Sequence, residues 1–335
     1  MRQIPAAGLP PVLCYHRVGG PLELGVTRVA RSSFARQMNA LARAGWRTLT
    51  LAEFSQRVMH PASRIPHLEF LLSFDDGYAS LGEHVYPVLD DVGFTATTFL
   101  ITDYVGRLNT WDVRYTWHRL AHLDWDTIGR WQERGFAFAS HSASHARLTW
   151  LSDARARDEL ERSRDTLVRR LGPGAGQAVA YPFGARDARV ERLACAAGYE
   201  MGFGGVRGNG SPLALARLPV YLWDVGRVPF GLRQDAIGSL GRFVADVANR
   251  CAVGTSVMLN VLTALQQSSR RHRGPHGVVP LVHVDRGPGD PGTERAREKR
   301  RGRADFPGGD GLGERRISGV ILDHPLDLPD SACGP

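Results

Sequence analysis

Residues 92–101 read VGFTATTFLI, and the junction that they form decides the fold class. A helical pattern ends at Gly93, where glycine suits the left-handed conformation that closes a helix, and a strand-like run follows. The same junction recurs three more times, as AGWRTLTL at Gly45, RGFAFASH at Gly135 and AGYEMGFGG at Gly198. Helices that alternate with strands predict βα units and a mainly parallel sheet, either a barrel or a doubly wound sheet.

Apolar residues upstream of these junctions recur with the period of a helix, as a buried helical face requires. The faces are Phe34, Met38 and Leu41; Val85, Val88, Leu89 and Val92; and Val190, Leu193, Ala194 and Ala197. A longer helix is expected over about residues 152–171. Ser33, Ser152 and Asp187 are the expected N-caps, because short polar side chains accept hydrogen bonds from the first turn.

Composition excludes several classes of protein. The chain has 335 residues and a net charge of +8, but only Lys299 is a lysine, and no basic cluster is interleaved with aromatic residues before residue 265. Nucleic-acid binding is therefore not expected. No apolar run is long enough to span a membrane, and the N-terminus has no apolar stretch with a cleavage site. As written, the chain is expected in the cytoplasm, although a misassigned start codon would hide an export signal.

The composition changes after residue 265. From there on the sequence is rich in glycine, proline and arginine, carries charges of both signs and shows no apolar period. Such a segment cannot bury enough apolar surface to fold. The sequence thus predicts a folded domain over residues 1–265 and a disordered tail over residues 266–335.

Candidate functional groups follow three of the expected strands. LLSFDDGYAS, residues 71–80, places Asp75 and Asp76 directly after an apolar run. Adjacent carboxylates repel one another, and burying either without a partner is costly, unless this stretch is only a turn with Gly77. SHSASH, residues 140–145, and AYPFGARD, residues 180–187, also follow strand patterns. Because the carboxyl ends of parallel strands meet at one edge, three such motifs favour a shared site.

The histidines indicate metal chemistry. His141 and His145 have the spacing that lets two imidazoles reach one ion, although two surface or N-cap histidines would have the same spacing. An anionic third ligand from the aspartate pair would complete the set and leave the other aspartate free as a base. A nearby cation would also stabilise both carboxylates against their mutual repulsion.

SFDDGY and HSASH, together with TATTFL, resemble motifs of the polysaccharide deacetylases, the NodB-homology carbohydrate esterases. The resemblance runs from about residue 10 to about residue 205. It implies a distorted (β/α) barrel in which Asp75 is the base. It also implies that Asp76, His141 and His145 hold one divalent metal, usually zinc.

The resemblance extends to a third motif, YPFG, and shows two departures from the family pattern. The motif implies that the Phe183 backbone N–H stabilises an oxyanion and that Tyr181 and Pro182 contact substrate. The family commonly has an arginine that orients the base at the position of Ala180. Its fourth motif, an Asp–Trp pair, has only the reversed LWD at residues 222–224 as a counterpart.

VLCYHRV and YPFG resemble a subgroup that deacetylates β-1,6-linked poly-N-acetylglucosamine. In this subgroup the barrel is circularly permuted, which makes His16 the expected general acid. His324, in GVILDHPL, is the alternative, but it follows a charged Gly/Pro-rich stretch that makes precise placement entropically costly.

The leading hypothesis is a metal-dependent hydrolase that removes N-acetyl groups from an N-acetylglucosamine-containing polysaccharide or oligosaccharide. One alternative keeps the site and makes the substrate an O-acetylated glycan, because metal-activated water also attacks esters. The other is a glycan-binding protein without catalysis, which the alanine at position 180 favours.

Overall fold

The computed structural model describes residues 9–20, 27–60, 68–110, 119–222, 224 and 226. All of them belong to one compact unit. The predicted domain boundary after residue 265 and the predicted tail lie outside the described residues.

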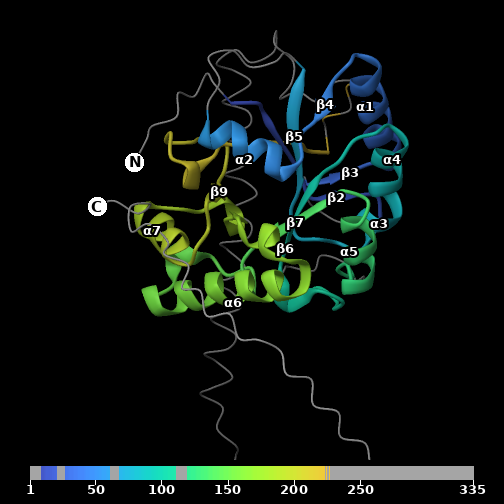
Figure 1. The fold of residues 1–335 in the computed structure, drawn as a ribbon. Coiled ribbons are helices and arrows are strands. Elements are labelled where there is room, and N and C mark those ends of the chain that lie inside the picture. Colours follow the sequence, from blue (N-terminus) through green and yellow to red (C-terminus); the bar gives the residue numbers. More distant parts are fainter. Residues whose placement is uncertain are drawn as a thin grey trace, which may run out of the picture. The chain divides into compact units, whose positions relative to one another are not determined.

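A curled parallel sheet forms the centre of the fold (Figure 1). Its strand order is β10-β1-β5-β6-β7-β8-β9, with β4 added beside β5, and β2 and β3 pair separately. The strands are β1 Val12–Tyr15, β2 Arg17–Val18, β3 Arg28–Val29, β4 Arg47–Thr48, β5 Glu69–Phe74, β6 Thr97–Leu100, β7 Ala137–Ser140, β8 Ala178–Ala180, β9 Met201–Phe203 and β10 Leu218–Pro219. The strand pairings described in the central sheet are all parallel, as the sequence predicts.

Residues 215–219 join the two edges of this sheet, and we call them the closing segment. Leu215 forms a bridge with Phe203 of β9, and Arg217 N donates to the Gly205 carbonyl at 3.0 Å. Only three residues after Leu215, Leu218 of β10 pairs with Leu13 of β1. The sheet therefore curls round on itself, and the predicted distorted (β/α) barrel is confirmed.

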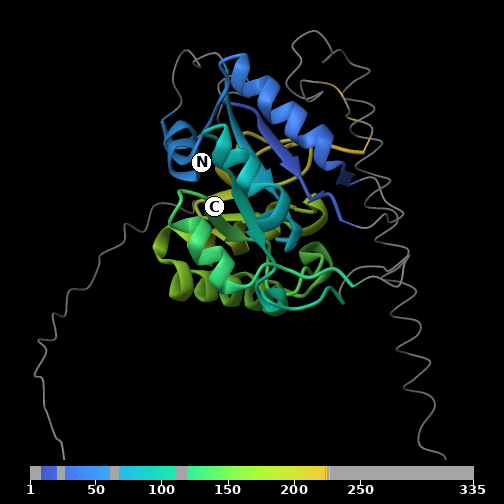
Figure 2. The ribbon, with the colours of Figure 1, turned by 90° about the vertical axis from the view of Figure 1, so that its right-hand side faces the viewer.

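Helices pack around the barrel, and one of them, Leu51–Met59, packs its apolar side chains against inward-facing strand residues such as Leu71 and Phe203. They are α1 Arg31–Arg43, α2 Leu51–Met59, α3 Ser80–His84, α4 Tyr86–Asp91, α5 Trp125–Gln132, α6 Asp153–Leu171 and α7 Ala188–Ala196. Short 3₁₀ turns lie at η1 Thr102–Tyr104, η2 Leu148–Trp150, η3 Pro173–Gly176, η4 Pro182–Gly184 and η5 Pro212–Ala214. In Figures 1 and 2, α1 and α6 lie on opposite sides of the barrel.

Alternation along each strand sorts side chains between the barrel interior and the helices. In β5, Phe70, Leu72 and Phe74 pack in the cluster beneath α1 and α4, whereas Leu71 joins the interior cluster. In β8, Ala178 and Ala180 point inward and Val179 packs against α6 and α7. A residue that directly continues a strand therefore faces the interior only if it lies an even number of positions from an inward-facing residue of that strand.

Most of the local sequence signals correspond to the structure. The four junction glycines adopt positive φ, between 70° at Gly93 and 88° at Gly135 and Gly198. The side chain of Asp187 caps α7 by accepting a hydrogen bond from Val190 N at 2.8 Å. Ser152 is the N-cap residue of α6, without a side-chain hydrogen bond. The prediction of Ser33 as an N-cap is wrong, because α1 begins at Arg31 and buries Ser33 within its first turn.

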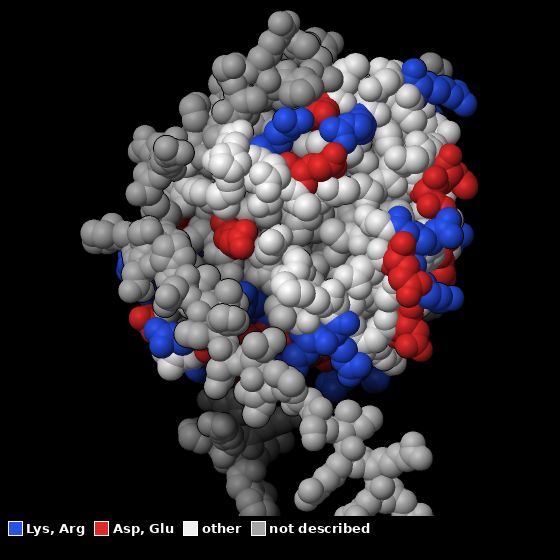
Figure 3. All heavy atoms as spheres, viewed as in Figure 1, with Lys and Arg blue, Asp and Glu red and all other residues white. Residues whose placement is uncertain are grey.

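Charges on the surface are mixed in sign. On the face viewed in Figure 3, basic and acidic side chains are interspersed. One such cluster surrounds α2, where Arg47 contacts Glu53 at 2.7 Å and Arg57 contacts Glu69 at 3.2 Å. Within the described residues, no helix combines the length and apolarity needed to span a membrane.

Two glycines should respond in opposite ways to replacement by alanine. A Cβ at Gly129 in α5 meets nothing within 4 Å, whereas one at Gly202 in β9 lies 2.6 Å from the Leu213 carbonyl oxygen. Gly129→Ala should raise the free energy of unfolding by about 0.5–1 kcal/mol, because alanine favours helix. Gly202→Ala should lower it by about 1–3 kcal/mol, because backbone atoms must shift. Denaturant titration measures both, and a stabilised Gly202→Ala would contradict the packing of β9 against the Leu213 carbonyl.

Candidate active site

The two aspartates lie where β5 ends. Asp75 continues the inward parity of Leu71 and Ser73, and its backbone N donates to the Tyr15 carbonyl of β1 at 2.9 Å. Asp76 has a φ of 68°, which breaks the alternation. Both side chains are buried, with exposures of 2% for Asp75 and 5% for Asp76. The aspartate pair is thus part of the barrel interior, and its carboxylates need partners there.

Positive φ angles concentrate at this site. Outside glycine, five described residues have positive φ, and only Leu68 lies elsewhere. The other four are Asp76 at 68°, Ser142 at 63°, His145 at 65° and Phe183 at 61°. Such backbone conformations are uncommon outside glycine and cost free energy unless surrounding contacts hold them. Three motifs that the sequence singled out therefore share a strained backbone.

Asp76, His141 and His145 bring three metal-ligating atoms together. Nε2 of His141 and Nε2 of His145 each lie 3.5 Å from Oδ1 of Asp76. The three donor atoms all lie within 4.8 Å of one another, and the three side chains are buried. Asp76 Oδ1 accepts no hydrogen bond from the described residues, although it is buried. Two imidazole nitrogens and one carboxylate oxygen are a ligand set typical of catalytic zinc, so these residues fit a divalent metal.

A backbone contact sets the tautomer of His141. Its Nδ1 lies 2.7 Å from the Ala180 carbonyl oxygen, which can only accept a hydrogen bond. Nδ1 therefore carries the hydrogen, and the lone pair of the neutral ring is on Nε2, which faces Asp76. Fixing a histidine ligand through its other nitrogen is a common feature of metal sites.

The electrostatic surroundings differ between the two histidines. Burial, reinforced by the nearby His141, lowers the pKa of His145 to about 3, which keeps this ring neutral at physiological pH. Burial also acts to lower the pKa of His141, but the charges of Asp75 and Asp76 outweigh it, and this pKa is raised. The pKa of Asp76 is lowered, because contacts with the two imidazoles outweigh its burial.

Asp75 is held by a buried arginine of the closing segment. Arg217 donates from Nη1 to Asp75 Oδ1 at 2.6 Å and from Nη2 to Oδ2 at 2.9 Å, and its Nε donates to the Gly204 carbonyl. A planar guanidinium that grips both carboxylate oxygens fixes the direction of the carboxylate. Burial alone would raise the pKa of Asp75, but the Arg217 charge outweighs it and holds this pKa far below its usual value.

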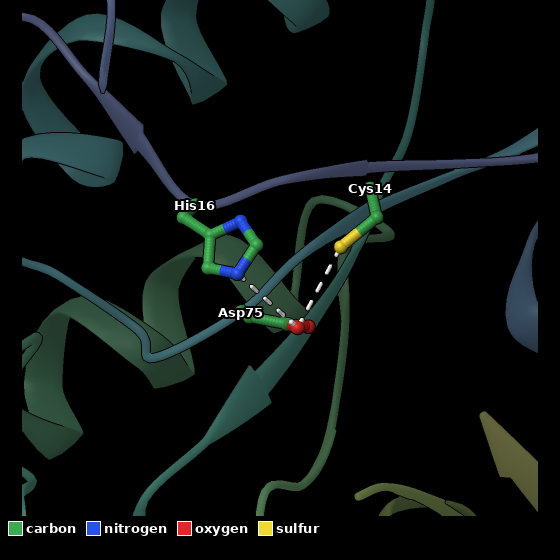
Figure 4. Close-up of side chains that lie close together, drawn as sticks. All are labelled: Cys14, His16 and Asp75. Atoms are coloured by element: carbon green, nitrogen blue, oxygen red, sulfur yellow. Dashed lines mark hydrogen bonds and ion pairs between the residues drawn. The ribbon is translucent and has the colours of Figure 1, made fainter. Parts of the chain in front are cut away.

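Cys14 and His16 approach Asp75 from β1 (Figure 4). Cys14 Sγ lies 3.6 Å and His16 Nε2 lies 3.8 Å from Asp75 Oδ2. These three residues could also be considered as metal ligands, but their chemistry does not suit an ion. Arg217 already engages both Asp75 oxygens, and burial raises the pKa of the Cys14 thiol, which stays protonated. A metal requires the thiolate, so the Asp76 group fits a metal better.

Comparison with known proteins identifies similar sequences and structures. The family model described as polysaccharide deacetylase matches residues 66–202. Over these residues the chain is similar to the polysaccharide deacetylase family. A curated relative in this family, Bacillus subtilis YxkH, is 28% identical over 193 residues, which cover 57% of this chain. The match spans 63% of the length of YxkH.

Solved deacetylase structures share the barrel. The Streptococcus pyogenes deacetylase PplD, solved in complex with acetate, superposes with a TM-score of 0.56 at 21% identity, covering 64% of this chain and 93% of PplD. IcaB from Ammonifex degensii has a TM-score of 0.51 at 25% identity, covering 72% of this chain and 97% of IcaB. The superposition with PplD shows that the two chains share a fold.

The family motifs in the sequence did not identify Arg217 as the partner of Asp75. Ala180, at the position where an arginine is common in the family, points into the barrel but has no functional group to reach Asp75. The arginine comes instead from the closing segment, 142 residues after Asp75 in the sequence. The available signal was one arginine inside the apolar run ALARLPV, residues 214–220.

The side chains of the third motif, YPFG, point in different directions. The Phe183 ring packs edge-on against His145, with centroids 4.6 Å apart. Tyr181 continues the outward parity of Val179, is fully buried beneath α6 and α7, and donates from its hydroxyl to the Leu213 carbonyl. The expectation that the Tyr181 side chain contacts substrate therefore fails, because the strand register turns it away from the interior. Pro182 is also buried. His324 and Trp223 lie outside the described residues.

Glu159 of α6 supports the loop between the two histidines. Its Oε2 accepts hydrogen bonds from the backbone N of Ala143 at 3.1 Å and of Ser144 at 2.8 Å, and its Oε1 accepts one from Ser144 Oγ at 2.6 Å. Ser142 Oγ accepts a further bond from His145 N at 3.1 Å. These contacts compensate for the unfavourable φ angles of Ser142 and His145 and thereby position the second imidazole.

Arg217→Met should be strongly destabilising. It leaves the Asp75 carboxylate buried without its partner, so we expect the free energy of unfolding to fall by about 3–5 kcal/mol. Arg134→Met is the matched control, because Arg134 pairs with Asp90 on the surface. Such an exposed pair contributes about 0–1 kcal/mol. Equal losses for the two variants in denaturant titrations would contradict the structural importance of the buried pair.

Glu159→Gln should weaken zinc binding by about 10- to 100-fold, the usual effect of removing a group that orients a metal ligand. The amide cannot accept on both of its terminal atoms, so at least one donor of the loop loses its partner. Glu161→Gln, at an exposed position on the same helix, is the control. Competition with a chromogenic chelator measures the affinity. Wild-type affinity in Glu159→Gln would show that the loop holds its shape without this carboxylate.

Proposed function

We propose that this chain is a metal-dependent hydrolase that removes N-acetyl groups from a polysaccharide containing N-acetylglucosamine. The convergence of Asp75, Asp76, His141 and His145 at one end of the barrel is the observation that carries this proposal. A binding protein needs no carboxylate held by an arginine beside a metal-ligating group. The alanine at position 180, which favoured a non-catalytic protein, loses its weight because Arg217 contacts Asp75 instead.

Asp76, His141 and His145 would hold the metal, for which zinc is the expected ion because of the ligand set. A cation bound there would polarise the acetyl carbonyl and lower the pKa of a water molecule. The His141 lone pair is aimed at this position by the Ala180 carbonyl, and His145 is neutral at physiological pH. The protein thus supplies ligands that need little rearrangement.

Asp75 would act as the base. Its carboxylate stays ionised, and its Oδ2 lies 3.9 Å from His141 Nε2, next to the metal ligands. Arg217 holds the carboxylate in place, so that Oδ2 can take the proton of the attacking water without losing its orientation. Water then adds to the acetamide carbon, and the backbone N–H of Phe183 is the proposed donor to the resulting oxyanion.

His16 would act as the general acid. It is the most exposed of the groups around Asp75, with 27% of its side chain accessible, and its Nε2 lies 3.8 Å from Asp75 Oδ2. An imidazolium at this position can give its Nε2 proton to the departing amine, after which the carbon–nitrogen bond breaks and acetate and the free amine are formed. Its place directly after β1, before the first helix, supports the resemblance to the permuted poly-N-acetylglucosamine subgroup.

Acetate release tests the proposed activity. We expect release from β-1,6- or β-1,4-linked N-acetylglucosamine oligomers, loss of release after chelation, and recovery when zinc is added back. Release from acetylated xylan alone would replace the amide by an ester substrate. Full activity in a metal-free preparation would overturn the metal-dependent mechanism.

Single substitutions separate the proposed roles. Asp75→Asn should keep the metal and lower kcat by about 10²- to 10⁴-fold, because a base is lost but no ligand. Asp76→Asn should lose metal first. His16→Ala should keep the metal and lose turnover to a similar degree. Metal analysis with kinetics on the same preparations decides, and metal loss in Asp75→Asn with retention in Asp76→Asn would exchange the two roles.

A further inference from the structure

The turn that follows the second histidine presents an exposed tryptophan. Leu148 of η2 is buried, but Trp150, two residues later, is 52% exposed. This is the largest exposure among the large hydrophobic side chains of the described residues. Tryptophan is highly buried on average, and this exposed indole follows the candidate ligand His145 by only five residues.

Arg147 lies against this tryptophan. The centre of its guanidinium is 4.8 Å from the centroid of the Trp150 ring, and its Nε lies 3.4 Å from Thr149 Oγ1. Its Nη1 is buried and donates no hydrogen bond to the described residues. Leaving a buried donor without an acceptor is costly. The pair therefore combines an exposed aromatic side chain with a guanidinium whose buried Nη1 lacks an acceptor among the described residues and would gain one if the side chain turned outward to a ligand.

The support beneath this pair is rigid. Arg189 of α7 donates from Nη2 to the Leu148 carbonyl and from Nη1 to the Leu151 carbonyl, both at 3.1 Å. It also contacts Asp153 at 2.8 Å. The turn is thus fixed on both sides of Trp150, which reduces the conformational entropy that ligand binding would cost.

Trp150 is also close in sequence to the candidate metal ligand His145. It follows His145 by five residues, which limits their Cα separation to about 18 Å even for an extended chain. The 3₁₀ turn of η2 shortens this separation further. A few sugar units of a polysaccharide span such a distance, so a glycan engaged at the metal group can reach Trp150.

We propose that Trp150 and Arg147 form a sugar-binding subsite for a pyranose ring of the polysaccharide, within a few units of the sugar that is deacetylated. This inference rests on the proposed function. The indole face would pack on the C–H face of the ring, and the guanidinium would donate to a hydroxyl or acetamide oxygen. A planar aromatic surface beside a directional donor suits an amphipathic sugar better than an apolar protein segment. The subsite would make long substrates bind more tightly than short ones.

Kinetics on short and long substrates test the subsite. The probes are the disaccharide and the hexasaccharide of N-acetylglucosamine, each in β-1,6 and β-1,4 linkage. Trp150→Ala should raise KM for the hexasaccharide of the preferred linkage by about tenfold, the scale of one lost aromatic contact. The loss of kcat/KM should be several-fold smaller on the disaccharide, and Trp150→Phe should recover part of the hexasaccharide affinity.

Met59→Ala is the matched control. Met59 is 36% exposed at the end of α2, and Arg57 of this helix contacts Glu69 at the start of β5, opposite the end that carries Asp75. This variant should behave like the wild type. A Trp150→Ala variant with wild-type KM on both hexasaccharides would overturn the subsite, as would equal losses on short and long substrates.

A binding measurement separates this inference from the proposed function. Calorimetric titration of the metal-loaded wild type and of Trp150→Ala with the hexasaccharides needs no turnover. Weaker binding by Trp150→Ala without acetate release from the wild type would keep the subsite and overturn the deacetylase. Acetate release with equal binding by both proteins would keep the deacetylase and overturn the subsite. The absence of both binding and release in the wild type would overturn both.

Discussion

The buried ion pair between Arg217 and Asp75 is the interaction on which the rest of the site depends. It links the end of β5 to the segment that closes the barrel, and both partners are almost fully withdrawn from water. Two charges can be buried together only when their geometry is good and the remaining donors are satisfied. Here the guanidinium covers both carboxylate oxygens and also donates to the Gly204 carbonyl. With Asp75 held in this way, Asp76 is free to face the two histidines, and neighbouring aspartates acquire different environments.

The backbone carries part of the cost of this arrangement. Strand alternation alone would point Asp75 inward and Asp76 outward, and the positive φ of Asp76 turns the second carboxylate back toward the interior. Ser142 and His145 likewise depart from ordinary backbone geometry, and contacts from Glu159 and within the loop hold them. The strain is therefore local to the residues that converge, and the regular strands around them are unaffected.

Much of this arrangement could be read from the sequence, because it depends on local chemistry. The glycine junctions predict the βα units, and residues that end parallel strands must meet at one edge, which brings Asp75, Asp76, His141 and His145 together. Two features depend on information that no local pattern contains. The outward position of Tyr181 follows from the register of β8. The role of Arg217 follows from barrel closure, and no spacing rule relates it to Asp75.

Closure of the barrel also affects the order in which the chain folds. Leu13 of β1 pairs with Leu218 of β10, so nearly the whole described domain lies between the two strands. Contacts so distant in sequence form late, because the entropy of closing the loop must be overcome first. During synthesis, β5 and its two aspartates leave the ribosome long before Arg217 does. The nascent domain therefore carries an uncompensated carboxylate at its centre, which favours an open barrel until the closing segment arrives and makes barrel closure and completion of the site a single event.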